Sequence, residues 1–139
     1  YLCKGYNFTN EVSYTIVWNF NTFGLGQNKS SLIPTLIVEG LKNNEIEVWA
    51  ADTVRDFQYI DNCIDGLVSI AESEALVGET LNLASGYGIT IGEITDMICM
   101  YIDTERIDIK KPKPISHKSI GDITKLKSML DWGPKVSLE

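Results

Sequence analysis

A run of eight residues with almost no polar interruption, SYTIVWNF at 13–20, constrains the fold most strongly. Unbroken stretches of β-branched and aromatic side chains are typical of a strand that is buried on both faces. A shorter run of similar character, TLNLA at 80–84, comes later in the chain. Strands of this kind occur in parallel sheets that are covered by helices. The two runs therefore predict two core strands of a parallel sheet.

Helical patterns stand between and after these strands. Amphipathic spacing and N-terminal capping residues mark four such segments. Their predicted starts are Ser30 and Ser31 with Pro34 in the first turn, Asp61 as the N-cap of a helix over 62–73, Thr90 in a capping box with Glu93, and Asp122 before ITKLKSML. Alternating strands and helices predict the α/β class.

A hairpin is predicted around a single arginine. The runs EIEVW at 45–49 and RDFQYI at 55–60 alternate apolar with polar residues and are joined by five residues. Arg55, just past this turn, has a planar fork of donors that matches phosphate or carboxylate oxygens. The other interpretation is an ion pair of Arg55 with Asp56 or Asp61. Composition alone leaves both open.

The charge balance and the apolar runs exclude two classes of partner. Twelve basic and nineteen acidic side chains give a net charge of −7, which repels polyanions. The basic cluster of Lys110, Lys111 and Lys113 is short and broken by prolines, so no nucleic-acid partner is expected. The longest apolar runs are too short to cross a bilayer, and no membrane partner is expected.

Cysteine and histidine are too sparse for a disulfide framework or a metal site. Cys3, Cys63 and Cys99 are widely spaced without a CxxC pair, and His117 is the single histidine. We expect a cytoplasmic protein without a bound metal. His117 has no serine or cysteine nucleophile in a recognisable context, so a surface or hydrogen-bonded histidine is expected.

Two glycine-rich segments resemble phosphate loops without matching them. Residues 86–92 have the spacing GxGxxxG instead of GxGxxG, and the Thr90 capping box explains the same residues. Residues 24–30 resemble a Walker loop, but Asn28 stands where a glycine must precede the lysine. The residues taken alone therefore favour a binding surface over a catalytic centre.

Five motifs occur in one order along the chain. They are VWNFNTFGLGQ, SSLIPTLI, EIEVW followed by TVRDFQYIDN, GETLNLASG, and DITKLKSMLDWGPKVSLE. This order resembles the C-terminal half of the extended short-chain dehydrogenases that act on sugar nucleotides, the NAD-dependent epimerase/dehydratase family. The resemblance implies the C-terminal part of a Rossmann-type fold, with two core parallel strands, a hairpin and about four helices. It further implies that residues 1–139 form the substrate-binding portion, and that the N-terminal dinucleotide-binding portion is absent from this chain.

The resemblance also implies which residues bind. Asn21 matches a substrate-phosphate asparagine, Trp49 a residue that packs against the base, and Arg55 the diphosphate-binding arginine. Ordinary core packing is the other interpretation of Trp49. Trp18 departs from the family, which usually has arginine there, and Lys113 lies where an arginine usually grips the nucleotide. The implied assignments are Asn19 and Phe20 for the cofactor, and Asn21, Leu32, Trp49, Arg55 and Lys113 for a nucleoside-diphosphate sugar.

The catalytic elements of that family are not found in the chain. Neither the glycine fingerprint nor a Tyr-x-x-x-Lys pair occurs, and the segment from Tyr1 to Lys4 has the wrong spacing. The resemblance thus implies the sugar-nucleotide-binding part of an NAD(P)-dependent epimerase or dehydratase, which binds no cofactor and has no activity on its own. The alternative is a truncated, non-enzymatic module that binds a nucleotide or a protein. Its partner would be the missing N-terminal half, or a second copy through the strand at 14–20.

Overall fold

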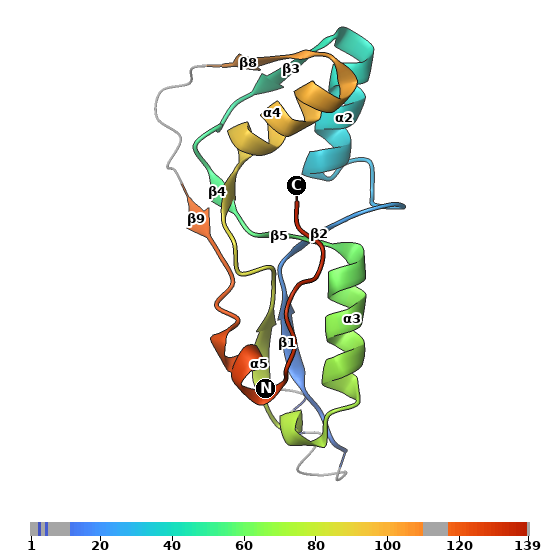
Figure 1. The fold of residues 1–139 in the computed structure, drawn as a ribbon, viewed down its shortest axis with the longest axis vertical. Helices are drawn as coiled ribbons and strands as arrows, with labels where there is room; N and C mark the ends of the chain where they lie inside the picture. The colour runs from blue at the N-terminus through green and yellow to red at the C-terminus, as the bar shows by residue number, and fades with distance from the viewer. Residues whose placement is uncertain (1–2, 4, 6–11, 110–116, 139) are drawn as a thin grey trace. The chain divides into compact units, whose positions relative to one another are not determined.

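The computed structural model describes residues 3, 5, 12–109 and 117–138 (Figure 1). The predicted proline-rich stretch at 111–115, with Lys113, lies outside these residues. The chain divides into two compact units. Unit 1 comprises Tyr1–Thr22, Phe57–Gly86 and Gly121–Glu139, and unit 2 comprises Phe23–Asp56 and Tyr87–Ile120.

Unit 1 is built on two parallel strands. Strand β1 (Ile16–Asn19) pairs with β6 (Thr80–Leu83), with Ile16 opposite Thr80 and Asn19 opposite Leu83. This pairing confirms the two predicted parallel strands. The remaining elements are the β2–β5 pair (Asn21–Phe23 and Phe57–Tyr59), α3 (Ile60–Ala71), the 3₁₀ turn η1 (Glu74–Leu76) and α5 (Thr124–Met129).

The core of unit 1 lies between β6, α3 and the C-terminal segment. Its buried residues share an apolar character and come from every part of the unit: Cys63, Ile70, Leu76, Leu81, Leu83, Leu126 and Trp132. Gly66 lies on the α3 face between Cys63 and Ile70, at helical spacing. A Cβ at Gly66 would meet Leu83 Cδ1 at 2.5 Å, so glycine is what allows α3 to pack this closely against β6.

Strand β1 is less buried than its sequence predicts. Val17 packs against the core cluster, but Trp18 is 65% exposed and Asn19 is exposed as well. The prediction of a strand buried on both faces is therefore wrong for the part of the chain that the structure describes. The physical reason is that successive side chains of a strand point to opposite faces, and the core cluster covers the face of Val17, whereas Trp18 on the other face is exposed.

Unit 2 combines two helices with short strands. Helices α2 (Leu32–Asn43) and α4 (Ile91–Ile102) pack against β3 (Glu45–Val48), which pairs in parallel with β8 (Glu105–Asp108) (Figure 1). Strand β4 (Val54–Arg55) lies between β7 (Ile89–Thr90), which is antiparallel to it, and β9 (Lys118–Ser119), which is parallel to it. Helices α2, α3, α4 and α5 correspond to the four predicted helices. None of the helices in the described part of the chain has the length and apolar character of a membrane span.

The predicted hairpin at 45–60 is wrong. Strand β3 pairs with β8, and β5 pairs with β2, so the two runs are not partners of each other. The connection between them is hydrogen-bonded to the start of α4: Gly92 N donates to Ala51 O and Ile91 N donates to Thr53 O, each at 3.0 Å. Because these bonds use the connection's carbonyl groups, the chain does not fold back on β3.

Two of the predicted helix starts agree with the structure. The Thr90 capping box is confirmed, because Glu93 N donates to Thr90 Oγ1 at 3.0 Å and Thr90 N donates to Glu93 Oε2 at 2.8 Å. The hydrogen bonds that Thr90 donates to Glu93 Oε2, from its backbone N and then from its Oγ1, hold the pKa of Glu93 below its ordinary value. Ser31 is the N-cap residue of α2, although its side chain makes no capping hydrogen bond.

The other two starts differ from their predictions. Tyr59, not Asp61, is the N-cap of α3, and Asp61 lies in the first turn, where the helix dipole favours a negative charge. Helix α5 begins at Thr124 with Ile123 as N-cap, one residue later than predicted. Asp122 Oδ1 still accepts a hydrogen bond from Thr124 N at 2.9 Å. The Thr124 side chain and then this backbone hydrogen bond lower the pKa of the Asp122 carboxyl.

Candidate functional site

The residues predicted to bind fall into both units. Asn19, Phe20 and Asn21 belong to unit 1, whereas Leu32, Trp49 and Arg55 belong to unit 2. Lys113 lies outside the described residues. The structure therefore groups the candidates as three in each unit, and their binding roles remain predictions.

Arg55 is the candidate whose side chain is best prepared for an anion. Its Nη1 atom donates to two backbone carbonyl oxygens, Val54 O at 2.9 Å and His117 O at 2.8 Å. These bonds hold the guanidinium on β4 and use two of its five donors. Among the residues that the structure describes, the donors on Nε and Nη2 have no partner. The guanidinium edge that carries Nε and Nη2 can donate two parallel hydrogen bonds to two oxygens of a phosphate or carboxylate.

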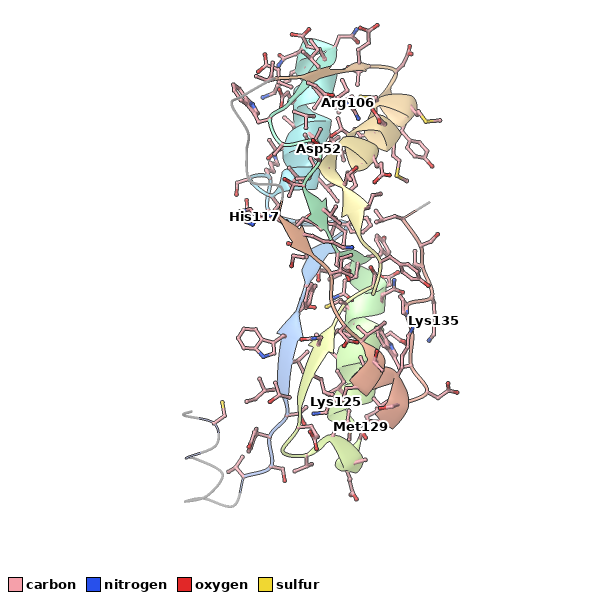
Figure 2. All side chains as sticks on the ribbon, turned by 90° about the vertical axis from the view of Figure 1, so that its left-hand side faces the viewer. Asp52, Arg106, His117, Lys125, Met129 and Lys135 are labelled. Carbon is pink, nitrogen blue, oxygen red and sulfur yellow. The ribbon has the colours of Figure 1, made fainter. Side chains whose placement is uncertain are left out.

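Arg106 in the same unit shows what a fully paired arginine looks like (Figure 2). Its Nη1 lies 2.6 Å from Asp96 Oδ2 and 2.9 Å from Gly92 O, and its Nε lies 3.0 Å from Asp108 Oδ1. Two carboxylates thus neutralise Arg106, which ties β8 to α4. The sequence identifies both arginines on strand-like runs, but their partners come from elsewhere in the chain.

The interpretation that Arg55 pairs with Asp56 or Asp61 is not what the structure shows. Within the described residues, Arg55 forms no ion pair with either carboxylate. Asp56 is fully buried and Arg55 is half-buried. Arg55 therefore keeps its positive charge without an acidic neighbour bound to it.

Trp49 and Leu32 are partly accessible in unit 2. Trp49 follows β3 and is 48% exposed, so ordinary core packing does not describe it. A half-exposed indole is suited to stacking on a flat ring. Leu32 is the first residue of α2 and is half-buried.

In unit 1 the three candidates follow one another at the carboxyl end of β1. Phe20 N donates to Leu83 O at 3.0 Å, and the exposed Asn21 opens β2. Ligands of parallel α/β sheets bind outside the carboxyl ends of the strands. The Asn19 amide is used internally, because Oδ1 accepts from Gln58 Nε2 at 2.7 Å and from Cys63 Sγ at 3.4 Å.

Gln58 is a functional candidate that the sequence analysis did not identify. It lies in β5 and is only 1% exposed, yet it carries an amide that contacts the turn after β1. In the sequence, Gln58 is a polar residue between the aromatic residues Phe57 and Tyr59 in a strand-like run. Because alternating polar residues usually mark the solvent-exposed face of a strand, this pattern did not reveal that Gln58 is buried.

The glycine-rich segment at 86–92 does not form a phosphate cradle. A Cβ at Gly88 would lie 2.3 Å from Ile120 Cδ1 and 2.7 Å from Val54 Cγ1, and one at Gly92 would lie 3.0 Å from Arg106 Nη1. Side chains of the protein thus occupy the space beside these glycines. The described residues do not fit the pyrophosphate of a dinucleotide at this segment.

Within the described ranges, the residues with nucleophile or base chemistry do not form a catalytic group. His117 is exposed, as predicted, and its backbone carbonyl accepts the bond from Arg55. Burial raises the pKa of the Cys99 thiol, and the charge of Asp96 raises it further. A raised pKa disfavours the thiolate that a cysteine nucleophile requires.

An open groove of ≈ 330 Å³ lies in unit 1 away from the predicted residues. Its lining is mainly aliphatic, from β1, α3 and the turn before β6, and includes Val17, Leu67, Ile70 and Val77. No charged side chain is among the described residues that line it. Such a groove has no group to neutralise a diphosphate, so the site is better placed around Arg55.

Comparisons with known proteins identify the family of the chain. A family model described as "NAD dependent epimerase/dehydratase family" matches residues 1–84. GDP-6-deoxy-D-talose 4-dehydrogenase of Aggregatibacter actinomycetemcomitans is 32% identical over 122 residues, which cover 84% of this chain and 41% of that protein. UDP-glucuronic acid decarboxylase 1 of Arabidopsis thaliana is 28% identical over 124 residues, which cover 86% of this chain and 28% of that protein.

A solved structure shows the same architecture. The crystal structure of UDP-glucuronic acid 4-epimerase from Bacillus cereus, in complex with UDP-glucuronic acid and NAD, matches with a TM-score of 0.84 and 25% identity. The match covers 99% of this chain and 45% of that one. It confirms the predicted α/β class as part of a Rossmann-type fold. The chain spans less than half the length of these three relatives.

Proposed function

The chain belongs to the NAD-dependent epimerase/dehydratase family, and we propose that it forms the part of a longer enzyme that binds a nucleoside-diphosphate sugar. The names of the relatives contain GDP-6-deoxy-D-talose and UDP-glucuronic acid. These compounds share a sugar attached to a nucleoside diphosphate. A diphosphate carries the negative charge that the site must recognise.

The observation that carries this proposal is the state of Arg55. Two backbone carbonyls hold its Nη1, and the Nε and Nη2 donors have no partner within the described residues. An arginine fixed in this way loses little conformational entropy when it binds a phosphate through two parallel hydrogen bonds. We assign Arg55 to the diphosphate.

Each unit also contributes candidate contacts of its own. Asn21 is exposed and can donate its amide to a substrate phosphate. Trp49 presents half of its indole surface for stacking on the base. Leu32 would line the nucleotide pocket, and Lys113 would supply a second cation.

The cofactor requires residues beyond those described. NAD or NADP, if bound in the longer enzyme, would supply hydride transfer from and to the sugar. Asn19 and Phe20 are the residues of this chain that we place beside it. Gly88 and Gly92 are packed against side chains, and the sequence contains no Tyr-x-x-x-Lys pair. We therefore expect the 139-residue chain to bind nucleotide sugars without converting them.

Titration calorimetry with UDP, GDP and UDP-glucuronic acid tests the proposal. We expect saturable binding of at least one of these probes to the full chain. Arg55→Ala should weaken that binding about tenfold or more, and Arg55→Lys should weaken it less, because lysine keeps the charge but loses the planar fork. Lys42→Ala, an exposed cation in the last turn of α2, is the charge-matched control.

The outcomes separate charge from geometry. Equal losses in Arg55→Ala and Lys42→Ala would mean that net charge alone governs binding, which contradicts a specific site. Absence of binding for all three probes would remove the proposed function. Urea denaturation of each variant checks that the loss of the Arg55 bonds to Val54 and His117 has not unfolded the chain.

Exposure of β1 favours a second candidate function, a module that associates with another polypeptide. Trp18 is 65% exposed on a strand whose described sheet has two members. Exposed strand edges invite pairing with another chain. Analytical ultracentrifugation of the chain and of Trp18→Ser tests this, since association through β1 should weaken in the variant and remain in Lys42→Ala.

A further inference from the structure

A buried glutamine links the carboxyl ends of the two parallel strands of unit 1. Gln58 Nε2 donates to Asn19 Oδ1 at 2.7 Å, at the end of β1, and to Leu83 O at 3.0 Å, at the end of β6. Both partners are acceptors, which determines the orientation of the amide. The side chain is 1% exposed, so water does not compete for these bonds.

The series of hydrogen bonds that begins at Gln58 reaches residues on both sides of Asn21. Asn19 Nδ2 donates to Thr22 Oγ1 at 3.1 Å, and Thr22 Oγ1 donates to Phe20 O at 3.2 Å. Leu83 O, which accepts from Gln58, also accepts from Phe20 N. Asn21 is the first residue of β2, and the residues on each side of it are connected to Gln58 through these bonds.

This arrangement has a cost in stability. Gln58 Oε1 is buried and has no hydrogen-bond partner within the described residues. A buried carbonyl without a partner loses its hydration and gains nothing in return. A methionine of similar size would fill the same space without that penalty. Methionine would also remove the two bonds from Nε2, but their acceptors each keep a second donor, Cys63 Sγ for Asn19 Oδ1 and Phe20 N for Leu83 O. The unpaired carbonyl is therefore the cost that remains specific to glutamine, and departures of this kind are expected at functional positions.

We propose that Gln58 is a positioning residue, which holds the junction of β1 and β2 at 19–22 (called the turn) so that Asn21 presents its amide to the substrate phosphate. This inference rests on the proposed function of Asn21. Gln58 acts through Asn19 and Thr22 and does not itself touch the ligand.

The test uses Gln58→Met and measures three quantities on the full chain. Urea denaturation gives stability, NMR hydrogen exchange gives the protection of the Phe20, Asn21 and Thr22 amides, and calorimetry gives the affinity for UDP-glucuronic acid. We expect an unchanged or higher urea midpoint, faster exchange at these three amides, and an affinity lower by about two- to tenfold. A purely structural role would lower the midpoint and leave affinity unchanged once the protein is folded.

A second variant and a matched control sharpen the result. Thr22→Val removes the hydroxyl between Asn19 and Phe20 O while keeping the side-chain shape, so it should reproduce the effects of Gln58→Met. Asn82→Ala removes one amide hydrogen bond, from Asn82 Nδ2 to Asp122 O, in the same two-stranded sheet but away from the turn. It should leave exchange at 20–22 and affinity unchanged.

Each outcome decides between the two proposals. If wild type binds and Gln58→Met binds equally, or if exchange at 20–22 is unchanged, the positioning role is overturned and the proposed function stands. If wild type binds none of the nucleotide probes, the proposed function fails. The exchange rates then still decide whether Gln58 orders the turn.

Discussion

Asn62 and Val136 exchange a pair of hydrogen bonds: Asn62 Nδ2 donates to Val136 O at 2.7 Å, and Val136 N donates to Asn62 Oδ1 at 3.0 Å. The same Oδ1 accepts from Lys135 N at 2.9 Å. The Asn62 side chain on α3 thus makes the hydrogen bonds that a neighbouring strand would otherwise make with the C-terminal segment, residues 130–138 after α5. Figure 2 shows Lys135 on that segment, alongside α3.

Substitution of Asn62 should release this segment. Asn62 is 3% exposed, and Asn62→Ala removes three hydrogen bonds to the backbone of Lys135 and Val136, which are themselves exposed. We expect a loss of about 2–3 kcal/mol in the free energy of unfolding, measured by urea denaturation. Asn82→Ala, which removes one amide bond to Asp122 O, should cost less than about 1 kcal/mol. Equal losses in the two variants would contradict the role assigned to Asn62.

Acid should weaken the contact between α3 and the C-terminal segment. The side-chain hydrogen bond from Lys135 lowers the pKa of Asp65 below its ordinary value of 3.8; burial opposes this shift, and the Trp132 hydrogen bond adds to it. A lowered pKa in the folded state means that Asp65 stabilises above pH 3.8, and that this contribution is lost as the pH falls through the folded-state pKa. In urea denaturation, Asp65→Asn should be less stable than wild type at pH 7, and the difference should shrink below pH 3.8.

Asp131→Asn is the control for this pH dependence. Asp131 is exposed, and no ion pair of the described residues includes it. Its removal changes the net charge by the same amount as Asp65→Asn. If both variants show the same pH dependence, overall charge and not the Asp65–Lys135 contact accounts for it.

Gly66 should tolerate no side chain. A Cβ there would lie 2.5 Å from Leu83 Cδ1 and 2.9 Å from Trp132 Cζ2, both within the core of unit 1. Gly66→Ala is expected to destabilise the fold by about 1–3 kcal/mol through overpacking, despite the better helix propensity of alanine. Gly133→Ala, where the nearest atom would be Lys127 Cε at 3.8 Å, should be within about 0.5 kcal/mol of wild type. Thermal and urea denaturation compare the two.

The two N-caps of unit 2 should differ in strength. Thr90 makes a full capping box with Glu93, whereas the Ser31 side chain makes no capping bond. Thr90→Ala should cost about 1 kcal/mol, and Ser31→Ala only a few tenths. Similar losses in urea denaturation would mean that the observed cap geometry does not determine helix stability here.

Local signals in the sequence predicted local structure well. The Thr90–Glu93 capping box depends on residues three apart, and the four helices depend on spacing within one segment, so no distant partner is needed. Asp61 shows the limit of this reasoning, because a good capping residue can also stand inside the first turn, and the helix start at Ile60 was missed by two residues.

The alternating pattern of the run at 45–48 could not predict which strand pairs with β3. The run at 45–48 has one alternating face, and this period does not say which other strand lies beside it. Bonds from Ile91 and Gly92 to the connection after β3 direct the chain away from a hairpin, and β8 becomes the partner. Such contacts join residues about forty positions apart, where local propensity carries no information.

The sequence by itself determined the α/β class, the two parallel strands, the capped helices and the family, because each of these depends on residue type and local spacing. Only the tertiary structure decided which arginine is neutralised. Arg106 lies between Asp96 and Asp108, while Arg55 bonds to carbonyl oxygens and keeps its remaining donors open within the described chain. The same holds for Gln58 and Asn62, whose burial and partners arise where separate segments pack. The sequence gives the charge and the hydrogen-bonding groups of each side chain. Whether these groups already have partners depends on which residues the fold places next to them.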